Sequence, residues 1–170
     1  SEYLRAKETA AHLGLDGPDW LVDFYLRERN WGDLDVLTEE ERQERFSANM
    51  AQREIDSFFW APPSGQSIAD LCLRIDRILE TMHRECAGKK VIVVCHGEVM
   101  WALRIRLERL SQERFMVLDK SNDPLDRMHN CQILHYSRCN YATGEISPFM
   151  QWVKSVCPTN PKLSRNVWEK

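Results

Sequence analysis

The sequence has no apolar run approaching the roughly 20 residues that a membrane-spanning helix needs, and its first residues are polar and charged, unlike a signal peptide. It has no basic excess, because 23 Lys and Arg face 26 Asp and Glu for a formal net charge of -3. Its six cysteines include no C-x-x-C pair, and several lie in apolar stretches. We therefore expect a cytoplasmic protein with reduced thiols, no membrane association and no nucleic-acid partner.

The chain of 170 residues is 43% hydrophobic and 29% charged, which is ordinary for a globular protein. No internal repeat or low-complexity stretch divides it. We expect one domain over residues 1–157, followed by a polar, extended C-terminal tail at 158–170.

Three segments have the apolar spacing and end signals of helices. Residues 1–13 form the first, with Ser1 as the predicted N-cap. Thr38 opens a charged helical region that reaches about residue 59 with one break. Ser67 caps an amphipathic helix over residues 68–86.

Between these helices lie segments rich in β-favouring residues. Residues 91–95 (Val-Ile-Val-Val-Cys) form a continuous apolar run, typical of a strand buried on both faces of a sheet. Residues 20–27 and 131–137 also predict strands, and residues 149–156 predict an edge strand. Because a helix is expected directly after the 91–95 strand, this order predicts a layered α/β fold.

His96 and Gly97 come at the carboxyl end of the 91–95 strand. Ligands of open α/β sheets bind at that edge, and the start of the next helix can direct free N–H groups at an anion. Gly97 would let a ligand approach the backbone closely. The alternative is that His96 only caps the helix, and the local sequence favours neither interpretation.

Arg5 and Glu28 are further candidates for chemistry. An arginine on the first turns of a helix beside a sheet edge can grip phosphate with its planar fork. A partly shielded carboxylate after a strand can have its pKa raised and act as a general acid. Taken alone, each residue is more often an ordinary surface side chain. The turn at residues 62–67 is interpreted as structural.

A metal site is a weaker alternative. It would use His129, Cys131, His135 and Cys139. On a strand these positions share a face, but they spread over too great a length to converge on one ion.

Five segments in order resemble motifs of the histidine phosphatase superfamily, also called phosphoglycerate mutase-like. Residues 1–10 resemble its S-x-x-x-R-A-x-x-T-A helix, and residues 26–33 its L-x-E-x-x-x-G segment. Residues 62–67 resemble its P-P-x-G-E-S turn, with Gln66 in place of the usual Glu. Residues 91–97 resemble the strand of its second histidine, and residues 130–133 its N-C-x-[IV] strand entry.

The resemblance implies a three-layer fold with a mostly parallel sheet flanked by helices, and transfer of a phosphoryl group through a phosphohistidine. Arg5 matches the second phosphate-binding arginine, and Glu28 matches the proton donor. His96 matches the second histidine, which polarises the phosphate, and the Gly97 N–H is a further donor. The implied substrate is a small phosphorylated molecule. No cofactor or metal is expected, because arginine and histidine supply the charge stabilisation.

The chain departs from the family pattern at the nucleophile. The family's Arg-His-Gly motif would precede Arg5, and the chain contains no such motif. We expect a preceding segment, of this chain or another, to supply it; without it the chain alone should be inactive. The expected function is a phosphohydrolase acting on a small phosphomonoester.

Three other functions stay open. The first is phosphotransfer of the phosphoglycerate mutase type, although the charged helical region after Glu28 mildly favours a phosphatase. The second is a non-catalytic, phosphate-binding regulatory protein. The third is an interaction module that uses residues 38–59 and the tail. No oligomeric state is predicted.

Overall fold

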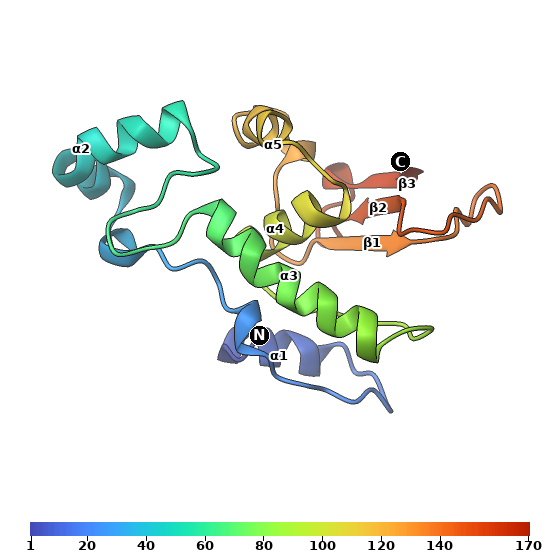
Figure 1. Ribbon diagram of the computed structural model, residues 1–170. Coiled ribbons are helices and arrows are strands. Elements are labelled where there is room, and N and C mark those ends of the chain that lie inside the picture. Colours follow the sequence, from blue (N-terminus) through green and yellow to red (C-terminus); the bar gives the residue numbers. More distant parts are fainter. The chain divides into compact units, whose positions relative to one another are not determined.

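A computed structural model describes residues 1–170 (Figure 1). Residues 1–106 and 107–170 form two separate units. The first unit contains α1 (Leu4–His12), η1 (Phe24–Leu26), η2 (Gly32–Leu34), α2 (Glu39–Ile55), α3 (Ile68–Glu85) and nearly all of α4 (Gly97–Leu107). The second contains α5 (Gln112–Asp119), η3 (Pro124–Asp126), β1 (Ile133–Ser137), β2 (Trp152–Val156), η4 (Pro161–Leu163) and β3 (Arg165–Glu169).

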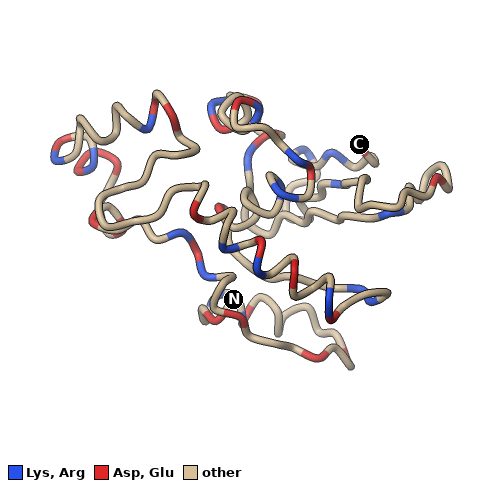
Figure 2. The backbone as a smooth tube through the Cα atoms, in the orientation of Figure 1, with Lys and Arg blue, Asp and Glu red and all other residues tan.

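Helix α3 confirms the prediction for residues 68–86. Ser67 and Asp70 form a capping box, in which each side chain accepts from the backbone of the other. Apolar side chains bury one face of the helix: Ile68, Leu71, Cys72, Ile75 and Ile78. Acidic and basic residues alternate along the rest of the helix (Figure 2). Burial of a continuous apolar stripe, with charges facing water, holds α3 in place.

Helix α2 begins where Thr38 predicts it, through a capping box with Glu41. The predicted break is at Phe46, whose φ of -130° and ψ of 28° are not helical. The helix ends at Ile55, short of the expected residue 59. The small core beside it consists of Leu34, Met50 and Trp60, with Trp31, Leu37 and Phe46 packed around it.

Helix α1 begins at Leu4, and Tyr3 occupies its N-cap position without a side-chain cap. The prediction that Ser1 caps this helix is therefore wrong. Ser1 instead directs its hydroxyl at the ring of His96. Gly14, directly after the helix, has a φ of +59°, the left-handed conformation common after a helix C-terminus.

The predicted strands at residues 20–27 and 91–95 are absent, and this part of the interpretation is wrong. Residues 24–26 form η1 instead, and no segment of the chain pairs with residues 91–95. A β-strand requires a neighbour that supplies hydrogen bonds, so β-favouring residues alone do not make one. Without a neighbour, Val91 and Ile92 are 46% and 52% exposed.

The second unit contains an antiparallel sheet in the order β1-β2-β3. Strand β1 confirms the strand predicted at residues 131–137. Strand β2 lies at the centre of the sheet and not at its edge, because residues 165–169 form β3 and pair with it. The expected extended tail is thus partly strand. The sheet is not the parallel one that was expected, and the domain limits at residues 157 and 158 stay a prediction.

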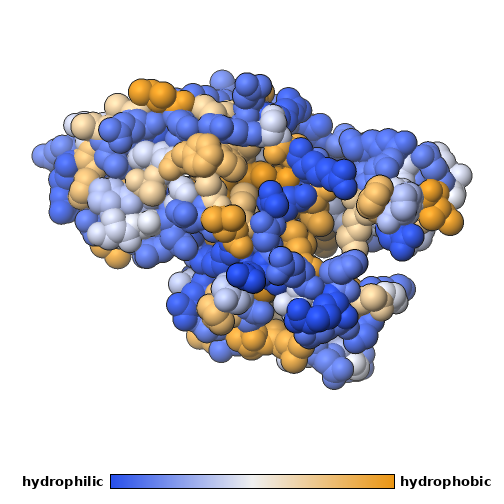
Figure 3. Space-filling model, viewed as in Figure 1, coloured by the Kyte–Doolittle hydropathy of each residue, from blue (hydrophilic) through white to orange (hydrophobic).

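Hydrophobic side chains reach the surface at several places (Figure 3). None of the helices combines the length and hydrophobicity that crossing a bilayer requires. All six cysteines are free thiols.

Candidate active site

His96 is 7% exposed, and its imidazole has a hydrogen-bond partner at each nitrogen. The Nε of Arg5 donates to Nδ1 at 3.1 Å, and Nε2 lies 2.9 Å from the Ser1 hydroxyl. Because Nδ1 accepts, the ring proton is on Nε2, which donates to Ser1. Burial, followed by the charge of Arg5, lowers the pKa of His96 to about 4. At neutral pH the ring is therefore uncharged and presents one N–H donor.

Arg5 lies on the first turn of α1 with part of its guanidinium unused. Its Nε is bonded to His96, and the group lies 4.8 Å from the centre of the Tyr3 ring. The same Tyr3 ring meets the His96 ring edge-on at 5.2 Å. The Nη groups make no hydrogen bond within the chain. Arg5 is thus oriented by one nitrogen, while its other donors are available to an anion.

Gly97 is the first residue of α4. The carbonyl of His96 accepts from the Met100 N–H at 2.8 Å, so His96 caps the start of α4 through its backbone and not through its ring. A Cβ at Gly97 would meet no protein atom within 4 Å, so open space borders the backbone here. The first N–H groups of a helix have no intrahelical partner and favour anions.

Glu28 follows η1, and its carboxylate accepts from the Arg29 N–H at 2.9 Å. Burial raises the pKa of Glu28, and the charge of Glu98 raises it further; the Arg29 and Glu98 amides and the Arg5 charge oppose the rise. The carboxyl group therefore keeps its proton to a higher pH than an exposed glutamate. The structure brings Arg5, Glu28, His96 and Gly97 into one region of the first unit.

Cys95 precedes His96, and its thiol is the nearest alternative nucleophile. Burial raises the pKa of Cys95 to about 12. A thiol that stays protonated at neutral pH is a poor nucleophile.

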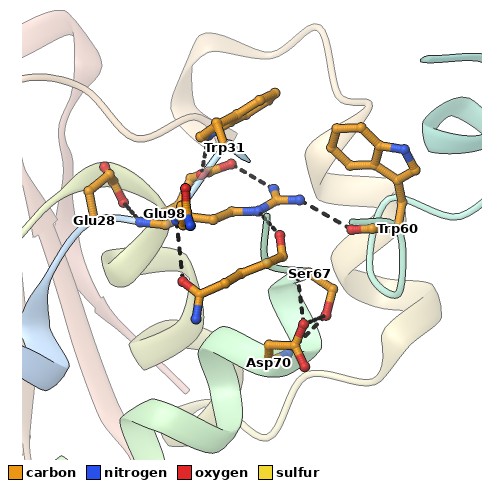
Figure 4. Close-up of polar contacts among 9 residues, drawn as sticks. Glu28, Trp31, Trp60, Ser67, Asp70 and Glu98 are labelled. Carbon is orange, nitrogen blue, oxygen red and sulfur yellow. Dashed lines mark hydrogen bonds and ion pairs between the residues drawn. The ribbon is translucent and has the colours of Figure 1, made fainter. Parts of the chain in front are cut away.

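Sequence reasoning missed a buried arginine beside Glu28. The side chain of Arg29 is 2% exposed, and its Nη1 pairs with Glu98 at 3.0 Å. Its Nε donates to the Gln66 carbonyl at 2.6 Å and its Nη2 to the Trp60 carbonyl at 3.2 Å. The indole of Trp31 donates to the other Glu98 oxygen at 2.9 Å (Figure 4). The charged run around Glu28 gave no sign of this burial.

Arg74 of α3 is a second arginine that sequence reasoning missed. Its Nη2 donates to the Arg27 carbonyl at 2.5 Å and its Nη1 to Gln66 Oε1 at 3.2 Å, while its Nε is buried without a partner. Its charge also contributes to the lowered pKa of His96. The sequence signal that could have identified Arg74 is its position on the predicted helix directly before Ile75, which is buried.

A model of the histidine phosphatase superfamily (branch 1) matches residues 1–129 of the chain. The chain belongs to the histidine phosphatase superfamily. The resemblance found in its motifs is therefore confirmed, and homologues in this superfamily are phosphatases or mutases.

Two relatives show how much of a longer protein the chain matches. A Rhizobium rhizogenes protein named 2,3-bisphosphoglycerate-dependent phosphoglycerate mutase is 29% identical over 109 residues, which are 63% of this chain and 52% of the relative. A Bos taurus protein named 6-phosphofructo-2-kinase/fructose-2,6-bisphosphatase 1 is 31% identical over 125 residues, 74% of this chain and 23% of the relative. The chain spans about half the length of the bacterial mutases it matches.

Solved structures of the superfamily share the fold. A mycobacterial glucosyl-3-phosphoglycerate phosphatase, solved with inorganic phosphate, superposes with a TM-score of 0.60 at 28% identity over 69% of this chain and 60% of the other. The alpha-ribazole phosphatase of Shigella flexneri has a TM-score of 0.60 at 20% identity over 67% and 57%, respectively. These matches support the α/β, phosphoglycerate mutase-like fold.

Proposed function

We propose that the protein containing this chain is a phosphohydrolase for a small phosphomonoester, and that it works through a phosphohistidine formed outside these 170 residues. The observation that carries the proposal is the pairing of Arg5 with a neutral His96, which leaves several N–H donors for one anion. Two neighbouring donor groups suit the oxygens of a phosphate.

In the proposed reaction each of the four residues has one task. Arg5, the His96 Nε2–H and the Gly97 N–H bind the phosphoryl oxygens, with the His96 donor leaving Ser1 for the ligand. The nucleophilic histidine attacks phosphorus, the P–O bond to the alcohol breaks, and Glu28 gives its proton to the departing oxygen. Water then attacks the phosphohistidine and returns a proton to Glu28, which releases inorganic phosphate.

We also propose that the complete protein has a larger sheet than residues 1–170 form. Residues 91–95 reach the site without a strand partner, while the Ser1 nitrogen donates to the Val94 carbonyl at 3.2 Å. A strand leading into Ser1 and carrying the nucleophile would pair with residues 91–95 and cover exposed Val91 and Ile92. It would also create the three-layer, mostly parallel sheet. The six free thiols suit the cytoplasmic location that we also propose.

Hydrolysis of two esters by the intact protein tests the proposal. His96→Ala should slow hydrolysis of 4-nitrophenyl phosphate by about 10² to 10³-fold, because a donor aimed at transition-state charge is lost. Glu28→Gln should slow hydrolysis of glycerol phosphate by about 10² to 10⁴-fold and 4-nitrophenyl phosphate much less, because nitrophenolate leaves without a proton. Vanadate should inhibit both reactions.

Glu80→Gln is the control, because Glu80 is exposed on α3. Unchanged turnover in His96→Ala would refute the assignment. An intact protein without any turnover that still binds phosphate would support the regulatory alternative. Transfer of the phosphoryl group to a second hydroxyl, with no release of phosphate, would identify a mutase.

A further inference from the structure

Glu98 lies two residues after His96 on the first turn of α4, and its carboxylate contacts two residues of the segment that follows Glu28. Its Oε1 accepts from Arg29 Nη1 at 3.0 Å, and its Oε2 accepts from the Trp31 indole at 2.9 Å (Figure 4). Arg29 in turn donates its backbone N–H to Glu28 at 2.9 Å. A chain of three hydrogen-bonded residues thus connects α4 to the proposed acid.

We propose that Glu98 is a positioning residue for Glu28: it anchors Arg29 and Trp31 to the start of α4, so that the acid and the phosphate-binding His96 are held on one rigid base. The inference rests on the proposed function. Both ends of Glu98 are fixed, because its backbone belongs to α4 and its two carboxylate oxygens have different donors.

The anchor is buried and has little freedom. The Arg29 side chain is 2% exposed and that of Glu98 is 24% exposed. The guanidinium packs against a pair of contacting indoles, 5.1 Å from the ring centre of Trp31 and 5.2 Å from that of Trp60. Carbonyls of Trp60 and Gln66 accept its other donors. A planar arginine that is bonded through all three of its nitrogens cannot shift without breaking several hydrogen bonds at once.

Electrostatics support the same role. The charges that shift the pKa of Glu28 are those of Glu98 of α4 and Arg5 of α1, and Glu28 in turn raises the pKa values of Arg74 of α3 and the Cys95 thiol. Among these, the Glu98 charge raises the pKa of Glu28, whereas the Arg5 charge lowers it. Loss of the Glu98 charge should therefore lower the pKa of Glu28 and deprive it of its proton at a lower pH.

Glu98→Ala in the intact protein tests this role by its dependence on the leaving group. We expect kcat for glycerol phosphate to fall about tenfold, a part of the 10² to 10⁴-fold that a general acid contributes, with KM little changed. Hydrolysis of 4-nitrophenyl phosphate should fall less than twofold. The alkaline limb of the glycerol phosphate pH profile should move to lower pH, because the acid acts in its protonated form. Glu98→Gln, which keeps an acceptor but loses the charge, should move the limb with a smaller loss of rate.

A double variant separates this inference from the proposed function. If Glu98 acts through Glu28, adding Glu98→Ala to Glu28→Gln should cause almost no further loss with glycerol phosphate. Equal losses for both esters, or a full tenfold additional loss in the double variant, would overturn the positioning role. If Glu28→Gln itself does not distinguish the esters, the acid role of Glu28 fails instead. Glu80→Gln is again the matched control, and thermal unfolding of each variant verifies the fold.

Discussion

Arg5 and Arg29 lie in the same site and differ in how they use their donors. Arg5 is exposed and donates from its Nε to His96, and its Nη groups make no hydrogen bond within the chain. Arg29 is buried and donates through Nε and both Nη groups to Gln66, Glu98 and Trp60. A guanidinium with free Nη groups is suited to an external anion, whereas one with every nitrogen bonded to the protein supports the structure around it.

The comparison teaches that charge alone does not identify a ligand-binding residue. The two arginines have the same charge and the same five N–H donors. Their roles differ because one has carbonyl and carboxylate partners supplied by the protein and the other has not.

The largest effect on stability is expected from Arg29→Met. The variant leaves the Glu98 carboxylate without its cation and the Gln66 and Trp60 carbonyls without a donor. Breaking a buried pair by removing one partner costs about 3–5 kcal/mol of unfolding free energy. Urea denaturation at pH 7, followed by tryptophan fluorescence, measures the loss.

Arg106→Met is the matched control for this variant. Arg106 pairs with Asp76 at 2.7 Å, but its side chain is 46% exposed. Exposed pairs contribute about 0–1 kcal/mol. If Arg29→Met and Arg106→Met lost equal unfolding free energy, Arg29 would not have the structural role that distinguishes it from Arg5.

Arg5→Ala should have the opposite profile, with weak effects on folding and a strong effect on phosphate. Loss of charged hydrogen bonds worth about 1.5–3 kcal/mol predicts an affinity about 10- to 100-fold lower. Titration calorimetry of the intact protein with inorganic phosphate measures this change, and Lys7→Ala, on the same helix, is the control. Phosphate affinity that survives Arg5→Ala but not Lys7→Ala would remove Arg5 from the anion site.

Local signals predicted part of the fold well. The helix at residues 68–86 was predictable because its cap, its apolar spacing and its end all lie within the segment itself. Residues 91–95 show the limit of such signals. Their β-branched run is genuine, but strand formation depends on a partner distant in sequence. The pairing of residues 165–169 with β2 was missed for the same reason, since nothing in a polar tail specifies its neighbour.

The candidate site divides in the same way. Arg5, Glu28 and His96 were recognisable from motifs, because their residue types and spacing follow a family pattern. The contacts between them were not, since the Arg5–His96 bond joins residues 91 positions apart. The role of Arg29 could not be predicted from the sequence, because a charged residue in a charged run is usually exposed, and its burial depends on two tryptophans that pack against it.

The smallest expected effect is a pH-dependent stability that His96 adds to the site. The pKa of His96 is about 4 when folded against an ordinary value of 6.5, so between these values the unfolded chain binds more protons than the folded one. Acidification from pH 7 toward pH 4 should therefore favour unfolding. Glu28 acts in the other direction, because its raised pKa makes the folded state the stronger proton binder above pH 4.5.

Urea titrations at pH 7 and pH 5 in a Glu28→Gln background isolate the contribution of His96. Adding His96→Asn should reduce the stability lost between these two pH values, because an amide does not titrate. Saturating phosphate should also reduce the stability lost between pH 7 and pH 5, since a dianion beside the ring offsets the Arg5 charge and raises the pKa of His96. An identical pH dependence with and without His96 would mean that burial and the Arg5 charge do not hold the ring neutral, and the contrast between the two arginines would then rest on Arg29 alone.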